Sequence, residues 1–319
     1  MLNLCQIYKK INMLKDKILN KEPGIVLYGM TPPKETTDVA NIKNIASKHL
    51  NRIKSLDIDG VVLYDIQDES VRNNEERPFP FLPTFEPQKY SGDFLADLEL
   101  PKVLFQVVGK HSEDTLKNWM QNNLSKGDLG VFIGNSSSSQ ASKVSLNDAY
   151  NLRREFALDM LVGGVAIPER HFAKKDEHLR MASKIELGAS YFTTQAVYNV
   201  EASKNMLSDY YYYSKSKNLP LVPIMMTFSP CGSKKTMEFM KWLGIHFPKW
   251  LKNDLTYSED ILGASIDTCV RTFKELLNYS LKKGIPIGVN VESVSIRKDE
   301  IDASIELLEN VKHLINKSL

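Results

Sequence analysis

Eight short apolar runs recur along this chain, and a segment with helical spacing of apolar residues follows each of them. Such runs are typical of parallel strands that are covered on both faces. Strands that alternate with helices favour a parallel sheet. Eight such units in 319 residues favour one closed α/β barrel, the (β/α)8 or TIM barrel, over an open sheet. The predicted strands span residues 24–30, 61–64, 102–107, 128–134, 161–167, 190–194, 220–226 and 285–291.

The segments between these strands predict helices and one long irregular stretch. Ser112, followed by two acidic residues, is a typical helix N-cap. Residues 66–101 are polar and proline-rich, which fits a lid or binding loop as well as a stiff surface connection. Lysines interrupt the apolar residues of 1–22, so we expect an extra N-terminal helix that caps a barrel domain of residues 23–319. Helices are predicted at 38–56, 112–124, 146–158, 174–187, 201–217, 234–243, 258–283 and 298–315.

Composition excludes several classes of protein. The net charge is only +2, from 41 basic and 39 acidic residues, so a nucleic-acid partner is not expected. No run reaches the length of a membrane span. Cys5, Cys231 and Cys269 have neither metal-site nor disulfide spacing, which suits a reducing cytoplasm.

In a barrel of this type, ligands bind where the strands end, at the carboxyl edge. A carboxylate at Glu292, flanked by valines, suggests an acid or base with a raised pKa, and Asp65 ends the second predicted strand. His171 and His178 are seven residues apart, so we expect no shared metal. The candidates along this edge are Thr31, Asp65, Gln67, Asp68, Asn135, Glu169, Arg170, His171, Gln195, Tyr198, Ser229, Glu292 and Ser293.

Each candidate also has an ordinary structural interpretation. His171 either contacts a ligand or caps its loop, and Glu169 either faces a ligand or pairs with Arg170. The carboxamide of Gln195 can donate and accept hydrogen bonds at once, which suits a planar amide-bearing ligand, although it could equally bond a neighbouring loop. Tyr198 lies at the same edge.

Two motifs in the segment 161–199 carry a resemblance to a known family. Ile167-Pro168-Glu169-Arg170-His171 resembles the Tyr-Pro-Glu-x-His loop of methylenetetrahydrofolate reductases, which are flavin-dependent (β/α)8 enzymes. The segment from Lys184 to Gln195 is similar to that family's Lys-x-x-x-Gly-Ala-x-x-x-x-Thr-Gln segment. Further similarity lies in 31–34, 222–225 and 235–250, so that the resemblance covers residues 24–314.

The resemblance implies FAD as cofactor, NAD(P)H as reductant and a folate-bound one-carbon unit as substrate. By this resemblance His171, Glu177 and Lys184 serve the flavin, and Gln195 contacts the folate. Asn135 and Ile167 occupy two further flavin-side positions of the family. Glu169 and Tyr198 are the remaining substrate-binding candidates.

Several of the family's chemical groups are replaced in this chain. Its acid–base glutamate falls on Gly29, its aspartate after the fourth strand falls on Asn135, and its third-strand histidine falls on Phe105. Losing a general acid costs about 10²–10⁴ in rate, so another carboxylate has to substitute if the reaction is retained. The carboxylates available for this role are Asp65, Glu292 and Glu69.

The sequence therefore favours a cytoplasmic oxidoreductase of the methylenetetrahydrofolate reductase type. The alternative is a non-catalytic ligand-binding or accessory subunit that keeps the barrel and part of the pocket. A different chemistry on the same barrel is a third possibility, because fold alone does not determine function. We expect a small folate-like partner molecule, and either a homo-oligomer or a reductase partner subunit.

Overall fold

The fold is that of a closed barrel of eight parallel strands, which pair in chain order. The structure is a computed structural model, and it describes residues 13–70, 75–135 and 142–319. The predicted (β/α)8 fold is confirmed. The strands are β1 (Val26–Met30), β2 (Gly60–Leu63), β3 (Lys102–Val107), β4 (Leu129–Ile133), β5 (Val162–Ala166), β6 (Tyr191–Ala196), β7 (Ile224–Phe228) and β8 (Ile287–Glu292).

Helices follow the strands in the order that the sequence predicts. Ser112 is the N-cap of α4 and accepts a hydrogen bond from the backbone N–H of Thr115. Ser145 and Asp148 form a reciprocal capping box at the start of α5. The helices are α2 (Val39–Lys54), α3 (Pro87–Phe94), α4 (Glu113–Lys126), α5 (Leu146–Phe156), α6 (Pro168–Lys174), α7 (Glu177–Glu186), α8 (Val200–Lys217), α9 (Lys234–Trp242), α10 (Lys249–Tyr257), α11 (Ile261–Lys283) and α12 (Lys298–Ser318).

Three segments differ from the sequence prediction. The polar loop expected at 168–171 is the helix α6, which begins at Pro168 because proline is well tolerated at the first helical position. Pro248 likewise precedes α10, which the sequence did not predict. The irregular stretch 66–101 contains α3, and its Thr84 forms a bridge with Lys34.

The N-terminal helix predicted over residues 1–22 falls mostly outside the described residues. Residues 13–19 are helical, with Leu14 and Ile18 buried. The division into a capping helix and a barrel domain therefore stays a prediction. The serine run 136–139 is also outside the described part of the chain. None of the helices described is both long and apolar enough to cross a bilayer.

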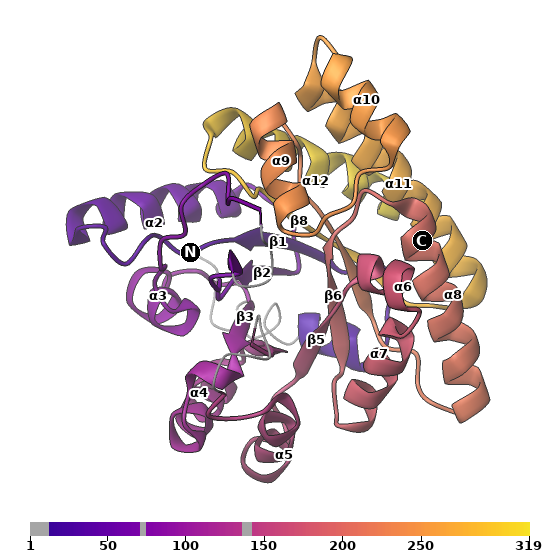
Figure 1. The fold of residues 1–319 in the computed structure, drawn as a ribbon. Coiled ribbons are helices and arrows are strands. Elements are labelled where there is room, and N and C mark those ends of the chain that lie inside the picture. The colour runs from indigo at the N-terminus through magenta and orange to yellow at the C-terminus, as the bar shows by residue number, and fades with distance from the viewer. Residues whose placement is uncertain (1–12, 71–74, 136–141) are drawn as a thin grey trace. The chain divides into compact units, whose positions relative to one another are not determined.

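The chain divides into two compact units. The first contains β2–β4 with α2–α5, and the second contains β6–β8 with α6–α12, while β1 and β5 contribute to both. Within the second unit, α6 and α7 both pack against α8, and α11 packs against α12 (Figure 1). The strand residues of β1, β2 and β7 are buried throughout, as expected of strands covered on both faces.

Candidate functional site

The first unit has a cavity of about 510 Å³ where β1 to β4 end. That volume is within the range of small-molecule sites, and the carboxyl edge is where barrels of this class bind ligands. The polar lining residues come from four successive strand ends. The lining is Glu35, Ile66, Gln67, Asp68, Phe81, Pro83, Thr84, Gly109, Lys110 and Asn135.

Asp65 lies beside this cavity and links the strand ends that surround it. Its carboxylate accepts a hydrogen bond from the backbone N–H of Val107 at 2.8 Å and another from the ammonium of Lys110 at 2.6 Å. Lys110 also donates to the carbonyl of Ile66 at 3.2 Å. The end of β2 is thereby tied to the end of β3, and Lys110 is kept at the cavity wall.

Asn135 and Gln67 supply the carboxamides of the cavity. Gln67 donates from Nε2 to the carbonyl of Gly134 at 3.1 Å. A Cβ at Gly109 would lie 2.0 Å from Asn135 Oδ1, so glycine is required there for the close approach of the Asn135 side chain. The cavity therefore combines two carboxylates, two carboxamides and one ammonium with apolar surface, which suits a flat, polar heterocycle.

Glu177 organises the second unit at the end of β5. Its carboxylate is fully buried and accepts the backbone N–H of Ile167 at 3.0 Å and the guanidinium of Arg170 at 2.8 Å. Arg180 lies 3.9 Å from the same carboxylate. These contacts supply the compensation that a buried charge requires.

Lys184 also bonds within the protein. Its ammonium donates to the carbonyl of Val165 at 2.7 Å, and its stem lies over Gly164, where a Cβ would lie 3.0 Å from Lys184 Cδ. Burial lowers the pKa of Lys184 to about 8, and the neighbouring Glu177 opposes that shift.

Glu169, on α6, carries a buried carboxyl group. Both carboxylate oxygens are buried, without a hydrogen bond of good geometry to a described residue. Burial raises the pKa of Glu169 to about 7, and the backbone N–H groups of Glu169 and His246 oppose the shift only in part. His246 stacks on Phe172 and lies 3.0 Å from the carboxamide of Asn199.

Gln195 and Tyr198 contact the loops that follow β6 and β7. Gln195 donates from Nε2 to the carbonyl of Leu243 at 2.7 Å. Tyr198 donates to the carbonyl of Ser229 at 2.7 Å and packs its ring on Phe247, with the centroids 4.3 Å apart. Burial raises the pKa of Tyr198 well above its usual value, so the phenol stays protonated.

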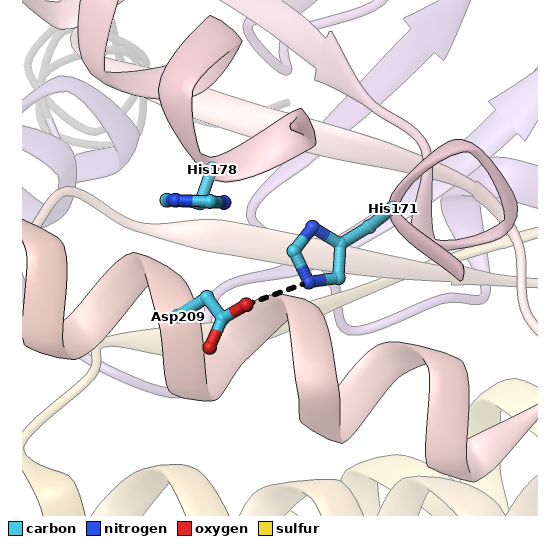
Figure 2. Close-up of side chains that lie close together, drawn as sticks. All are labelled: His171, His178 and Asp209. Atoms are coloured by element: carbon cyan, nitrogen blue, oxygen red, sulfur yellow. Dashed lines mark ion pairs between the residues drawn. The ribbon is translucent and has the colours of Figure 1, made fainter. Parts of the chain in front are cut away.

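His171 lies close to His178 and Asp209, which Figure 2 shows. His171 Nε2 is 3.1 Å from Asp209 Oδ2, and the two imidazole rings meet edge to face at 5.4 Å. Burial lowers the pKa of His171, and Asp209 partly opposes the shift. The structure thus brings the two histidines together, although a separation of seven residues did not lead us to expect it.

Three further positions named from the sequence lie in the strands themselves. Glu292 is the last residue of β8 and is partly buried. Gly29 lies in the buried strand β1. Phe105 packs edge to face on Tyr64 at 4.8 Å, so an aromatic contact occupies the position of the family's histidine.

The groups that the resemblance assigns to flavin are engaged with the protein itself. Glu177 accepts two hydrogen bonds, Lys184 donates to a main-chain carbonyl, and His171 faces α8. A flavin would have to compete with these contacts for the same groups. The described residues are therefore a poor fit to the family's flavin site.

Sequence reasoning missed four residues of these arrangements. Glu35 and Lys110 line the cavity, His246 lies beside Glu169, and Asp209 faces His171. Glu35 and Lys110 follow strands at the predicted edge, so a wider search of that edge would have included them. Asp209 and His246 lie inside or beyond helices, where the strand-end rule gives no signal.

Comparison with known proteins agrees with the predicted family. The family model for methylenetetrahydrofolate reductase matches residues 135–292. A solved structure of an uncharacterized protein from Clostridium thermocellum, which binds two copies of 5-methyl-5,6,7,8-tetrahydrofolic acid, shares 50% sequence identity. That match covers 94% of this chain and 99% of the other, with a TM-score of 0.83. The chain belongs to the methylenetetrahydrofolate reductase family.

Two further solved structures match this chain at low sequence identity. Bombyx mori aldo-keto reductase in complex with NADP has 14% identity and a TM-score of 0.44, over 92% of this chain and 88% of that one. Xanthomonas albilineans dihydropteroate synthase with 4-aminobenzoic acid has 10% identity and a TM-score of 0.46, over 91% and 92% of the two chains. The search of curated proteins gave no match.

Proposed function

We propose that this protein binds a reduced folate that carries a one-carbon unit, and that it acts on that unit as an oxidoreductase of its family. The observation that carries the proposal is the cavity at the ends of β1 to β4, with its paired carboxylates and carboxamides. The 5-methyltetrahydrofolate bound by the Clostridium thermocellum relative, at 50% identity, supports the choice of ligand.

The chemistry of the cavity suits the pterin ring of a folate. A pterin presents an amino group and a ring N–H side by side, and one carboxylate can accept both. Glu35 and Asp68 are the carboxylates of the lining. Gln67 and Asn135 can each donate and accept along the carbonyl edge of the ring. Lys110 supplies a positive charge that suits the glutamate tail of the folate.

The second unit offers a second group of folate-binding candidates. Glu169 can donate a hydrogen bond as a neutral acid or accept two as a carboxylate, and its pKa of about 7 keeps both forms accessible. We propose that Gln195 and Tyr198 also contact a folate in this unit. The two copies of 5-methyltetrahydrofolate held by the relative make the binding stoichiometry a useful measurement.

The proposed reaction converts a methylene group into a methyl group. A hydride from NAD(P)H would complete the methyl group on N5, while N10 takes up a proton as its bond to that carbon breaks. Asp65 in the first unit and Glu292 in the second remain the proposed acids. The proposed reaction does not use FAD, because the flavin-side groups bond within the protein.

Calorimetric titration of the full-length protein with 5-methyltetrahydrofolate tests the binding proposal. We expect saturable binding of one or two equivalents. Asn135→Ala should weaken it about 10-fold, because losing hydrogen bonds between protein and ligand costs roughly 1–3 kcal/mol. Asn122→Ala, on the exposed face of α4, is the matched control and should bind like the wild type. A wild-type protein that binds no reduced folate would overturn the proposal.

The oxidoreductase part is tested separately. Oxidation of NADPH or NADH is followed with 5,10-methylenetetrahydrofolate as substrate, with and without added FAD. Turnover that does not depend on FAD would support the proposed reaction in the absence of a flavin. Tight folate binding with no turnover under either condition would instead support a ligand-binding or accessory role.

A further inference from the structure

Three side chains from three consecutive helices converge on one point in the second unit. His171 lies on α6, His178 on α7 and Asp209 on α8, and one ligand atom from each lies within 4.8 Å of the others. Figure 2 shows the two imidazole rings and the carboxylate facing the same space. None of the three has a role in the folate cavity of the first unit.

A bend in the chain creates this convergence. Lys175, the residue after α6, adopts a left-handed conformation with φ of 58°. The chain therefore turns between the two histidines, where a continuous helix would have placed them about 10 Å apart along its axis. Because α6 and α7 both pack on α8, Asp209 completes the group.

His171 has a charged neighbour, the carboxylate of Asp209 at 3.1 Å, and this contact leaves its ring nitrogens incompletely satisfied. It is fully buried, and apart from the contact to Asp209 neither ring nitrogen has a hydrogen-bond partner of good geometry among the described residues. Nδ1 of His178 is buried and similarly without such a partner among the described residues. Buried polar atoms without hydrogen bonds are rare and usually have a specific reason. Here the nitrogens face the same space as a carboxylate, which is the arrangement of metal ligands.

We propose that His171, His178 and Asp209 form a binding site for a divalent transition metal, with Zn²⁺ as the best match. Two imidazole nitrogens and one carboxylate oxygen suit Zn²⁺, whereas Ca²⁺ and Mg²⁺ prefer oxygen ligands alone. Ligand atoms in a tetrahedral zinc site lie about 3.3 Å apart. The His171 Nε2 to Asp209 Oδ2 distance of 3.1 Å is already close to that value.

The rest of the site can adjust to the ion. The Asp209 side chain is 51% exposed, which leaves a path for the metal and room for a water as fourth ligand. Among the described ion pairs, Asp209 pairs with His171 alone. A bound metal would tie α6 to α8 and so hold the helix that carries Glu169. This inference is independent of the proposed folate binding.

Metal titration of untagged, full-length protein, first stripped of metal with a chelator, tests the proposal. Zn²⁺ affinity is measured by competition with a chromophoric chelator, and Co²⁺ gives visible absorption bands that report the ligand geometry. We expect one equivalent of Zn²⁺ and the spectrum of a four-coordinate Co²⁺ site. His178→Ala and Asp209→Asn should each weaken Zn²⁺ binding at least 10-fold, because each removes or weakens one of three protein ligands.

His313→Ala removes an exposed histidine of α12 and is the matched control, so it should bind Zn²⁺ like the wild type. Circular dichroism checks that each variant is folded, and His178→Ala decides the matter if Asp209→Asn does not fold. Wild-type affinity no higher than that of His178→Ala would overturn the proposal and leave a structural ion pair between His171 and Asp209. Zn²⁺ should also raise the melting temperature of the wild type but not that of His178→Ala.

Discussion

The ammonium group of Lys184 donates a hydrogen bond to the main-chain carbonyl of Val165 at 2.7 Å, at the carboxyl end of β5. The resemblance assigns this lysine to a flavin, yet in this protein it joins α7 to the strand before it. The same holds for Glu177, whose carboxylate fixes the start of α6 through Ile167. Glu177 and Lys184, which the family also has, therefore stabilise the carboxyl end of β5 in this protein.

We expect Lys184 to make stability depend on pH in the alkaline range. Its pKa is about 8 in the folded protein and 10.5 in the reference state. Between these values the unfolded chain binds more protons, so the contribution of Lys184 to the free energy of unfolding rises with pH. Relative to Lys184→Met, the wild type should gain on the order of 1–3 kcal/mol between pH 8 and 10.5.

Urea unfolding of both proteins across that pH range measures the difference. Lys174→Met, at an exposed position on α6, is the control and should follow the wild type. A constant difference between wild type and Lys184→Met would show that the folded-state pKa of Lys184 is not lowered.

We expect Glu169 to lower the free energy of unfolding as the pH rises from 4.5 to 7, which is the opposite of the effect of Lys184 at alkaline pH. Its pKa is about 7 in the folded protein against 4.5 in the reference state, so the folded protein binds the additional proton between these values. Its stabilising contribution is complete below pH 4.5 and disappears as the pH rises through 7. Glu169→Gln, which stays neutral, should therefore be more stable than the wild type above pH 7, by at most about 3 kcal/mol. Thermal unfolding at pH 5 and pH 8 measures this, with the exposed Glu186→Gln as control.

Asp65 can be tested both as a structural and as a catalytic group. Asp65→Ala leaves the buried N–H of Val107 without its acceptor and should lower the free energy of unfolding by about 1–3 kcal/mol. Lys110→Met removes only a half-exposed partner, at 45% exposure, and should cost no more than about 1 kcal/mol. Asp65→Asn retains an acceptor for Val107, so a stable Asp65→Asn protein with folate binding but reduced turnover would assign Asp65 as the acid. Unchanged turnover would exclude that role.

A substitution at Gln195 tests whether this residue contacts the ligand or only stabilises a loop. Its Nε2 holds the carbonyl of Leu243 in the loop after α9. We expect Gln195→Ala to weaken 5-methyltetrahydrofolate binding by about 5- to 30-fold, which corresponds to the removal of one or two hydrogen bonds to the ligand. Fluorescence titration measures the affinity, and urea unfolding of the same variant measures the loss of loop support. An affinity within twofold of the wild type, together with lower stability, would restrict Gln195 to a structural role.

Local features of the sequence were sufficient for the order of the elements and for the fold class. The eight apolar runs, the N-cap at Ser112 and the strand-to-helix alternation depend on residues a few positions apart. The strands are parallel because each helical segment returns the chain to the same end of the next strand, and the number of units, eight, favoured closure into a barrel. The strand-end rule also placed Asp65 and Asn135 near one edge, and both lie at or beside the cavity.

The sequence could not show which side chains from distant parts of the chain come into contact. Nothing near His171 in the sequence points to Asp209, and only the left-handed turn at Lys175 and the packing of α6 and α7 on α8 bring those side chains together. The protonation of Glu169 and Lys184 was equally undetermined, because a pKa depends on burial and on partners that tertiary packing supplies. The sequence alone therefore determined the barrel and its family. The tertiary structure decided which side chains meet and which of the family's residues hold the barrel together, since both depend on contacts between helices and strands far apart in the chain.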